Sequence, residues 1–368
     1  METQERRDIV TFGPGRTGFP RALRVVVGVL ALVVATLLVW QRLAPEPATP
    51  RPSPPPQRLI APRDAPVWAD RSGIHVGDQV LRPARTPYAL TLVADGVVYR
   101  DQAGGLWHQP LASGVARRIG RSATWASPVG QADGDAVAWV EGVGPGPEHL
   151  VLYDVARGRR LLRSGPLVDL LRRPSGDWVS NEGPILYADR DRVVYAASDG
   201  TFELDRATLV TTRLPGEEPG DYEVPDTIAE TVDAVHGLRA VVTCCTRAKS
   251  RSPLAFADER GRIRDRLGAA VPSGLFNHDW TRFADVVESD DRHHVEIADV
   301  GSGQTRTLTT TSDVGSRIAW GYGDVLVVAR GASADPARPE LLACMVRSFA
   351  CTPLEADPGP DGFLLPAS

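Results

Sequence analysis

The sequence predicts an all-β repeat domain that follows a membrane-spanning helix and a proline-rich linker. Three observations support this prediction. From residue 67 onward, pairs of short hairpins recur every 41 to 53 residues; residues 25–40 carry no charge; and residues 45–66 contain nine prolines. The expected segments are a cytoplasmic tail (1–21), a transmembrane helix (22–40), a linker (41–65) and a β-propeller domain (66–368).

The uncharged run Val25–Trp40 predicts the membrane helix. Sixteen residues rise about 24 Å as a helix, slightly less than a hydrocarbon core of about 30 Å. Extending the helix back to Ala22 makes it long enough, because Arg24 near its end can reach the headgroups. Trp40 then lies at the opposite interface, where indole rings are common.

The residues around this run favour a retained anchor with its N-terminus in the cytoplasm. A signal-peptide cleavage site needs small residues at −3 and −1, and cleavage after Ala44 would place Arg42 at −3. The arginines near the run are Arg6, Arg7, Arg16, Arg21 and Arg24 before it, and Arg42, Arg51 and Arg58 after it. This excess on the N-terminal side predicts a single-pass protein of the cell membrane whose C-terminal domain is extracytoplasmic.

The proline-rich segment that follows predicts a spacer. It includes the run PSPPP at residues 52–56. Such a sequence favours the extended polyproline II conformation, which advances about 3.1 Å per residue. We therefore expect residues 41–65 to hold the C-terminal domain away from the membrane.

The repeats predict strands in groups of four. The second hairpin of each repeat is clearest in LVLYDVARGRRLLR (150–163), TFELDRATLVTTRL (201–214), LAFADERGRIRDRL (254–267) and VEIADVGSGQTRTL (295–308). A first hairpin precedes each of them, with turns such as Asp95-Gly96 and Asp133-Gly134 that suit tight connections. Four antiparallel strands at this period are typical of a β-propeller blade.

Seven four-stranded blades are expected, with six or eight as alternatives. Six repeats are complete, and the ends of the chain supply a further unit. Residues 66–83 predict three strands, and residues 361–368 predict one. Pairing the C-terminal strand with the N-terminal three would close the ring and remove an exposed sheet edge.

This pattern resembles the bacterial TolB-like and WD40-like extracytoplasmic propellers. The resemblance rests on turns such as ADG and DGD that lead into VVY and VAW strands, and it covers most of residues 66–368. It implies a propeller fold and the binding of proteins or envelope components. The resemblance does not identify any catalytic residue in this chain.

The four cysteines predict disulfides rather than a metal site. Six residues separate Cys344 from Cys351 across an expected turn, so a cross-strand disulfide is predicted. The adjacent Cys244 and Cys245 either form a vicinal disulfide or remain thiols, with one of them buried as a small apolar group. Neither pair has the CxxC spacing of zinc ligands, and we expect no metal and no cofactor.

Two polar groups are weak candidates for a site. The first is His278-Asp279, expected near a strand end that faces the central channel, where a hydrogen bond between blades is favoured over a catalytic pair because no GxSxG motif is present. The second comprises Glu288, Asp290, Asp291, His293 and His294. Carboxylates and imidazoles bind divalent cations, but an expected inter-strand loop of this composition is also an ordinary solvated turn.

Composition and motifs favour a binding role over catalysis. The formal net charge of −5 gives no indication of a nucleic-acid partner, and none is expected. We expect a non-catalytic binding or scaffold module for a protein or cell-envelope ligand. One alternative is a carbohydrate-active hydrolase or lyase that uses channel-facing carboxylates, for which the acids considered are Glu182, Asp189, Asp191 and Asp226. Another alternative is an envelope sensor or assembly factor that signals through the short N-terminal tail.

Overall fold

The computed structural model describes the repeat domain with several gaps. The described residues are 64–142, 146–167, 170, 183–197, 200–214, 228–235, 238–244, 252–258, 263–270, 275–279, 281–289, 292–302, 304–308, 317–330, 340–357 and 363–367. The predicted tail, membrane helix and linker lie outside them. Within the described part of the chain, no helix is long and apolar enough to cross a bilayer.

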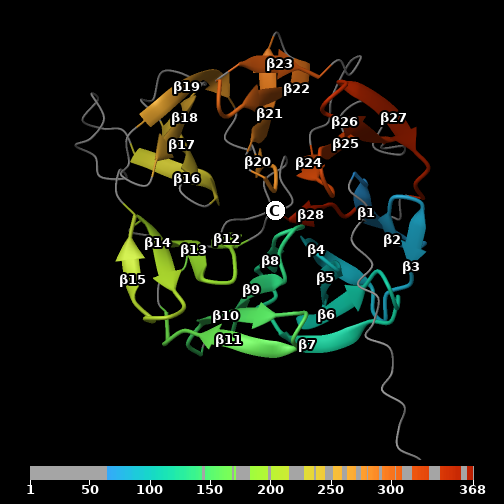
Figure 1. The fold of residues 1–368 in the computed structure, drawn as a ribbon, viewed down its shortest axis with the longest axis vertical. Coiled ribbons are helices and arrows are strands. Elements are labelled where there is room, and N and C mark those ends of the chain that lie inside the picture. The colour runs from blue at the N-terminus through green and yellow to red at the C-terminus, as the bar shows by residue number, and fades with distance from the viewer. Residues whose placement is uncertain are drawn as a thin grey trace, which may run out of the picture. The chain divides into compact units, whose positions relative to one another are not determined.

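The described residues form a β-propeller, in which small sheets are arranged in a ring (Figure 1). The first two sheets along the chain contain β1 (Val67–Asp70), β2 (Gly73–Val76) and β3 (Gln79–Leu81), and then β4 (Pro87–Val93), β5 (Gly96–Asp101), β6 (Gly105–Pro110) and β7 (Arg117–Arg121). The next two contain β8 (Val129–Gly130), β9 (Ala136–Glu141), β10 (His149–Asp154) and β11 (Arg159–Arg163), and β12 (Ile185–Ala188), β13 (Arg192–Ala197), β14 (Gly200–Asp205) and β15 (Thr211–Arg213).

The second half of the ring repeats the same arrangement. Its sheets contain β16 (Ile228–Val235), β17 (Leu238–Cys244), β18 (Ser252–Asp258) and β19 (Ile263–Ala270); β20 (Leu275–Phe276), β21 (Arg282–Ser289), β22 (Arg292–Asp299) and β23 (Thr305–Thr307); and β24 (Arg317–Trp320), β25 (Val325–Arg330), β26 (Glu340–Met345) and β27 (Ala350–Leu354). The last strand, β28 (Pro366–Ala367), lies parallel to β4. All other strand pairs are antiparallel neighbours in sequence, as the paired hairpins predict.

The described residues form six blades of four or more strands, so the prediction of seven four-stranded blades is wrong and the alternative of six is the one that the structure has. Six described sheets have four or more strands, whereas β1, β2 and β3 form a three-stranded sheet. The C-terminal segment meets that sheet at one bridge, where Leu364 and Ala69 exchange backbone hydrogen bonds of 3.0 and 2.8 Å. It then passes to β4, because Pro366 has no N–H with which to continue the pairing. The expected contact between the two ends of the domain is present, but no full fourth strand forms.

Aspartates at the ends of the third strands explain the most regular part of the repeat. Asp154, Asp205 and Asp299 each accept a hydrogen bond of 2.8 Å from the backbone N–H three residues later. A short acidic side chain is well suited to fix a turn in this way. The repeated Asp therefore has a structural role in the hairpin.

The core consists of clusters shared by neighbouring sheets. One cluster joins the β8–β11 and β12–β15 sheets, and another joins the β20–β23 and β24–β27 sheets. Trp320, which is 1% exposed, belongs to the second cluster and donates a hydrogen bond of 2.9 Å to the carbonyl of Leu275 in the neighbouring sheet. Apolar packing between sheets, reinforced by such bonds, holds the ring together.

The disulfide between Cys344 and Cys351 confirms the prediction. The two residues face each other in the β26–β27 ladder. For the vicinal alternative, Cys245 and the side chain of Cys244 lie outside the described residues.

We expect the substitution of both Cys344 and Cys351 by alanine to reduce the free energy of unfolding by about 2–3 kcal/mol, because the bond restricts a short loop of the unfolded chain. Chemical denaturation of the wild type and the double variant measures this difference. As a control, adding a reductant to the wild type should reproduce most of the loss and should leave the variant unchanged. An equal stability of the two proteins would contradict the expectation.

Candidate functional site

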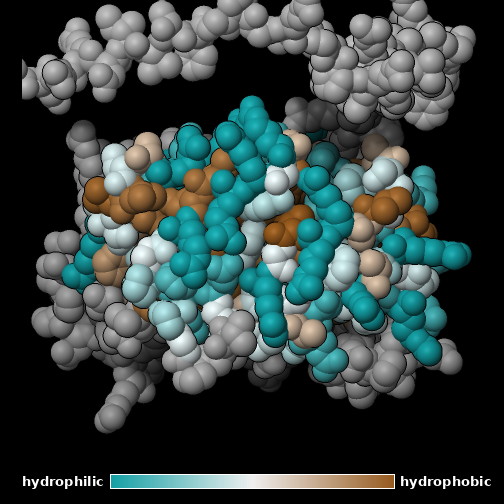
Figure 2. All heavy atoms as spheres, turned by 90° about the horizontal axis from the view of Figure 1, so that it is seen from below, coloured by the Kyte–Doolittle hydropathy of each residue, from teal (hydrophilic) through white to brown (hydrophobic). Residues whose placement is uncertain are grey.

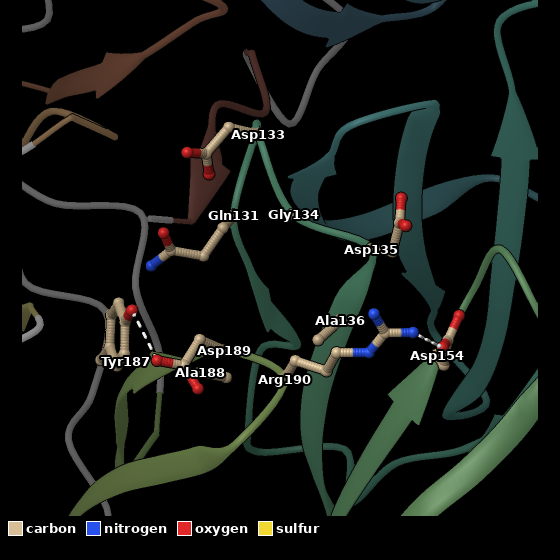
Figure 3. Close-up of a pocket in the computed structure, with 10 residues that line it drawn as sticks. All are labelled: Gln131, Asp133, Gly134, Asp135, Ala136, Asp154, Tyr187, Ala188, Asp189 and Arg190. Atoms are coloured by element: carbon tan, nitrogen blue, oxygen red, sulfur yellow. Dashed lines mark hydrogen bonds and ion pairs between the residues drawn. The ribbon is translucent and has the colours of Figure 1, made fainter. Parts of the chain in front are cut away.

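A pocket opens between the β8–β11 and β12–β15 blades on the side of the ring where the first strand of each blade turns into the second (Figure 3). It has a volume of about 350 Å³. The residues that line it are Gln131, Asp133, Gly134, Asp135, Ala136, Asp154, Tyr187, Ala188, Asp189 and Arg190. They come from the β8–β9 turn, the end of β10, and the end of β12 with the turn that follows it.

The aspartate at the end of β10 connects the two blades. The side chain of Asp154 is 1% exposed, and its Oδ2 accepts hydrogen bonds from Arg157 at 2.9 Å and from Arg190 at 2.8 Å. Arg190 extends from the neighbouring blade to reach it (Figure 3). Both arginines are about half exposed, so the buried carboxylate is neutralised by groups at the surface.

Asp189 is fixed on the other side of the pocket. Its Oδ1 accepts the backbone N–H groups of Asp191 at 2.7 Å and Arg192 at 2.9 Å, which shapes the β12–β13 turn. Its Oδ2 accepts a hydrogen bond of 2.9 Å from the hydroxyl of Tyr187. Burial and the charge of Asp189 raise the pKa of Tyr187, so its hydroxyl keeps its proton at neutral pH and continues to donate.

The pocket carries a small excess of negative charge. Four aspartates line it, and three arginines are paired with two of them: Arg157 and Arg190 with Asp154, and Arg192 with Asp189 at 3.4 Å. Asp133 and Asp135 lie on the β8–β9 turn, and Asp133 is exposed. Such a surface favours cationic groups of a ligand over anionic ones.

The predicted pair His278-Asp279 lies in the β20–β21 turn, but the two side chains do not form a catalytic pair. Nε2 of His278 lies 3.0 Å from the carbonyl oxygen of Gly321, to which it donates. Oδ1 of Asp279 instead accepts bonds from Thr281 and Asn277. The favoured prediction, a hydrogen bond between blades, describes His278 correctly.

The surroundings of His278 also make it a weak base. Burial lowers its pKa, against the opposing effects of Asp133, the Gly321 carbonyl and Asp279. It is therefore neutral at neutral pH, which suits its role as a hydrogen-bond donor.

Glu288, His293 and His294 of the second predicted cluster lie in the strands of the β21–β22 hairpin, whereas an inter-strand loop was predicted. Glu288 pairs with His293 in the β21–β22 ladder, so strand structure continues to Ser289 and resumes at Arg292. Asp290, Asp291 and the side chains of Glu288 and His293 lie outside the described residues. Nε2 of His294 lies 3.1 Å from Oε1 of Glu296. Among the described side chains, no group of three or more acids, histidines or cysteines is arranged to hold a metal ion.

A cluster of Asp70, Ser72 and His75 in the β1–β2 hairpin was not predicted. Nε2 of His75 lies 2.8 Å from the Ser72 hydroxyl and 3.0 Å from Oδ1 of Asp70, and Trp68 stacks on the ring at 4.4 Å. A nucleophilic triad needs the carboxylate and the hydroxyl on opposite nitrogens of the imidazole. Here both meet the same nitrogen, so the cluster stabilises the hairpin.

This cluster should make stability depend on pH. Burial raises the pKa of Asp70, but hydrogen bonds from the side chains of Ser72 and His75 and from the backbone N–H groups of Asp357 and Ser72 outweigh it and lower the pKa to about 2. The ionised Asp70 carboxylate therefore contributes fully to the free energy of unfolding above a pH of about 4. This contribution is lost as the pH falls towards 2.

We expect Asp70→Asn to cost about 2 kcal/mol at pH 7, and the difference from the wild type to shrink as the pH falls from about 4 to about 2. Urea denaturation of both proteins over this pH range measures it. A difference that does not change with pH would show that the charge of Asp70 is not responsible.

Searches by sequence find no relative: no family model matches, and no curated protein matches. Solved structures, in contrast, show the fold. The β-propeller domain of the Trilobed protease from Pyrococcus furiosus is similar with a TM-score of 0.52 and 8% identity, over 79% of this chain and 96% of that one. TolB from Acinetobacter baumannii matches with a TM-score of 0.45 and 16% identity, over 73% of this chain and 65% of TolB. The chain thus spans just under two thirds of TolB.

Proposed function

We propose that this protein is a membrane-anchored, extracytoplasmic β-propeller that binds a protein or cell-envelope ligand without catalysing a reaction. The observation that carries this proposal is the pocket between the β8–β11 and β12–β15 blades. Four aspartates and one arginine from two adjacent blades line a single hollow there. The uncharged run Val25–Trp40 supports the anchor, and the proline-rich linker supports a domain held away from the membrane.

The described carboxyl groups whose pKa is shifted include no candidate for the proton donor of a glycosidase. A glycosidase needs one carboxylic acid whose pKa is raised, so that it can protonate the leaving group. Among the described carboxyl groups every shifted pKa is lowered: those of Asp70, Asp95, Asp101 and Asp279 against the effect of burial, and those of Asp205 and Asp299 by hydrogen bonds within their own turns. Of the acids considered for hydrolysis, Glu182 and Asp226 lie outside the described residues.

The other two acids considered for hydrolysis, Asp189 and Asp191, already interact with other groups of the chain. Asp189 fixes its turn and accepts the Tyr187 hydroxyl, and Asp191 lies 3.6 Å from Arg206 with 80% of its side chain exposed. A solvated ion pair and a turn-capping carboxylate are poor candidates for acid–base chemistry. These two aspartates are consistent with a surface that binds a charged ligand.

Site-specific photo-crosslinking in intact cells tests the proposal. A photoreactive residue replaces Asp135 in the pocket or, as the matched control, Arg85, which is exposed just before β4 and so on the opposite side of the ring. We expect a discrete adduct with a protein or envelope polymer from position 135 and none from position 85. Equal labelling from both positions, or no adduct from position 135, would contradict binding at the pocket.

A change of charge in the pocket should then alter the yield of the cross-linked adduct. Arg190→Glu removes a guanidinium from Asp154 and adds a negative charge, so a cationic ligand should be held more strongly, provided that the fold is retained. Asp135→Lys has the opposite effect on the charge. We expect the adduct yield, measured from a neighbouring photoreactive residue, to fall in Asp135→Lys and not in Arg190→Glu.

A further inference from the structure

The outer strands of two neighbouring blades carry the same pattern of arginines. β7 reads RRIGR and β11 reads RRLLR, so each strand has an arginine at its first, second and fifth positions, and all of these are exposed. This part of the rim faces the viewer in Figure 2, where hydrophilic side chains cover much of the described surface. We call it the arginine rim, and its members are Arg117, Arg118, Arg121, Arg159, Arg160 and Arg163.

The outer strands of the other sheets are much less basic. β3 and β27 contain no charged residue, β15 and β23 contain one arginine each, and β19 contains two arginines with an aspartate between them. An exposed charge on an outer strand discourages pairing with another chain. That protective role does not explain why arginines are concentrated on two adjacent blades of a chain whose net charge is −5.

Contacts between the two blades hold these strands close together. The guanidinium of Arg117 in β7 donates to the carbonyl oxygen of Val155, in the turn that leads into β11. Two residues after Arg121, the N–H of Ala123 donates a hydrogen bond of 2.7 Å to the carbonyl oxygen of Val140 in β9. Like charges held close together repel each other, so the rim is a place where a bound anion reduces electrostatic repulsion.

One carboxylate neutralises part of the β11 end of the rim. Glu141 in β9 forms ion pairs with Arg160 at 3.3 Å and with Arg163 at 2.6 Å. Among the described side chains, no carboxylate is paired with Arg121 or Arg159. Each blade therefore presents at least one arginine whose charge is balanced mainly by solvent.

The acids near the start of β7 are shared with other groups. Asp95 and Asp101 attract Arg117 and Arg118 electrostatically. Both carboxylates also form hydrogen bonds with other side chains of the β4–β7 blade. Three acids thus interact with the six arginines of the rim, which leaves an excess of positive charge there.

The spacing of the arginines fits a ligand with several negative charges. A strand advances about 3.3 Å per residue, so the first and last arginines of each strand are about 13 Å apart. A single small anion cannot contact both, whereas a polymer with an anionic group on every repeat unit can contact several. Guanidinium groups bind phosphate with two parallel hydrogen bonds, and the release of counterions from a densely charged polymer adds to the affinity.

We propose that the arginine rim binds a linear polymer of the cell envelope that carries phosphate in its repeat units. The envelope origin of the polymer rests on the proposed extracytoplasmic location, whereas the phosphate chemistry rests on the rim alone. None of the six arginines lines the pocket, so the two surfaces are tested separately.

Two other anionic partners fit the rim less well. Neither β7 nor β11 contains an aromatic residue on which the bases of a single-stranded nucleic acid could stack. For a bilayer, Val115 is the one large apolar side chain that the described residues expose next to the rim, so little can insert between the lipids. The expected proline-rich linker also keeps the domain away from the membrane.

Binding of labelled inorganic polyphosphate to the purified full-length chain, in micelles of a neutral detergent, tests the proposal. We expect saturable binding by fluorescence anisotropy, with an affinity that falls as the salt concentration rises. Arg121→Gln combined with Arg159→Gln should weaken binding by about tenfold at low salt. It should also make the slope of log affinity against log salt concentration shallower by about 1.4, because two phosphate contacts are lost at about 0.7 each.

Two further double variants separate this effect from folding and from net charge. Arg121→Lys combined with Arg159→Lys keeps both charges and should keep the salt dependence of the wild type. Arg71→Gln combined with Arg317→Gln is the matched control, because both arginines are exposed and lie on other sheets. It makes the same change in net charge and should bind polyphosphate like the wild type.

Three outcomes would overturn the proposal: no binding of polyphosphate at low salt, an unchanged affinity and salt slope in the Arg121→Gln, Arg159→Gln variant, or an equal loss in the Arg71→Gln, Arg317→Gln variant. Competition at equal phosphate concentration distinguishes the partners. If duplex DNA, or phosphatidylglycerol added to the micelles, displaced the label better than unlabelled polyphosphate, the occupant would be a nucleic acid or a bilayer, which would also overturn the proposal.

Discussion

Deletion of residues 363–368 should have the largest effect on folding. The segment places Phe363 and Leu365 in an apolar cluster with Trp68 and Leu341, so its removal exposes core surface on two sheets. It also removes the Ala69–Leu364 bridge and the pairing of β28 with β4. Losing one buried Phe and one buried Leu together is expected to cost more than about 5 kcal/mol.

Thermal unfolding followed by circular dichroism measures this effect. The matched control is a chain in which Ser368 alone is removed, which should unfold like the wild type. If the larger deletion also unfolded at the wild-type temperature, the C-terminal segment would not be needed to close the ring.

Gly321→Ala should have the second largest effect. A Cβ at this position would lie 2.3 Å from the carbonyl oxygen of Ala65, which accepts a hydrogen bond of 2.9 Å from the N–H of Tyr322. The N-terminal segment would have to move away, and the mutual bonds between Ala65 and Tyr322 would weaken. We expect a loss of about 4 kcal/mol in the free energy of unfolding.

Gly165→Ala is the matched control for this substitution. No atom lies within 4 Å of a Cβ built at Gly165, so its effect should be within about 0.5 kcal/mol. Chemical denaturation of the two variants and the wild type gives both values. Equal effects of the two substitutions would contradict the close approach of residue 65 to residue 321.

The fold could be predicted because its signals are local and repeated. The hairpin pattern of residues 150–163 and 201–214 appears in the structure as β10–β11 and β14–β15, and the Asp in each segment fixes the turn. The extent of the last strand could not be predicted in this way. Whether residues 363–367 pair along β1 or leave after one bridge depends on tertiary packing, and no local pattern encodes that.

The pocket could not be predicted from the sequence, for a related reason. Asp189 was noted among many acidic turn residues, but nothing in the chain indicated that Arg190 reaches Asp154 in the next blade, 36 residues earlier. In the sequence, Asp154 at the end of β10 cannot be distinguished from its counterparts in other repeats, Asp205 and Asp299. The contact arises because neighbouring blades bring the third turn of one (β10–β11) next to the first turn of the other (β12–β13). The sequence therefore predicts the types of residues at such a site, but not their association.

We propose that the propeller is extracytoplasmic and is held at the membrane by an anchor at Val25–Trp40. The bond between Cys344 and Cys351 offers the most direct test, because structural disulfides persist in oxidising compartments and are rare in the cytoplasm. Cells that make the full chain are quenched in acid, free thiols are alkylated, and the peptides are analysed by mass spectrometry. We expect the two cysteines to be linked in the full chain and alkylated in a chain that lacks residues 1–40. Alkylation of both cysteines in the full chain would contradict it.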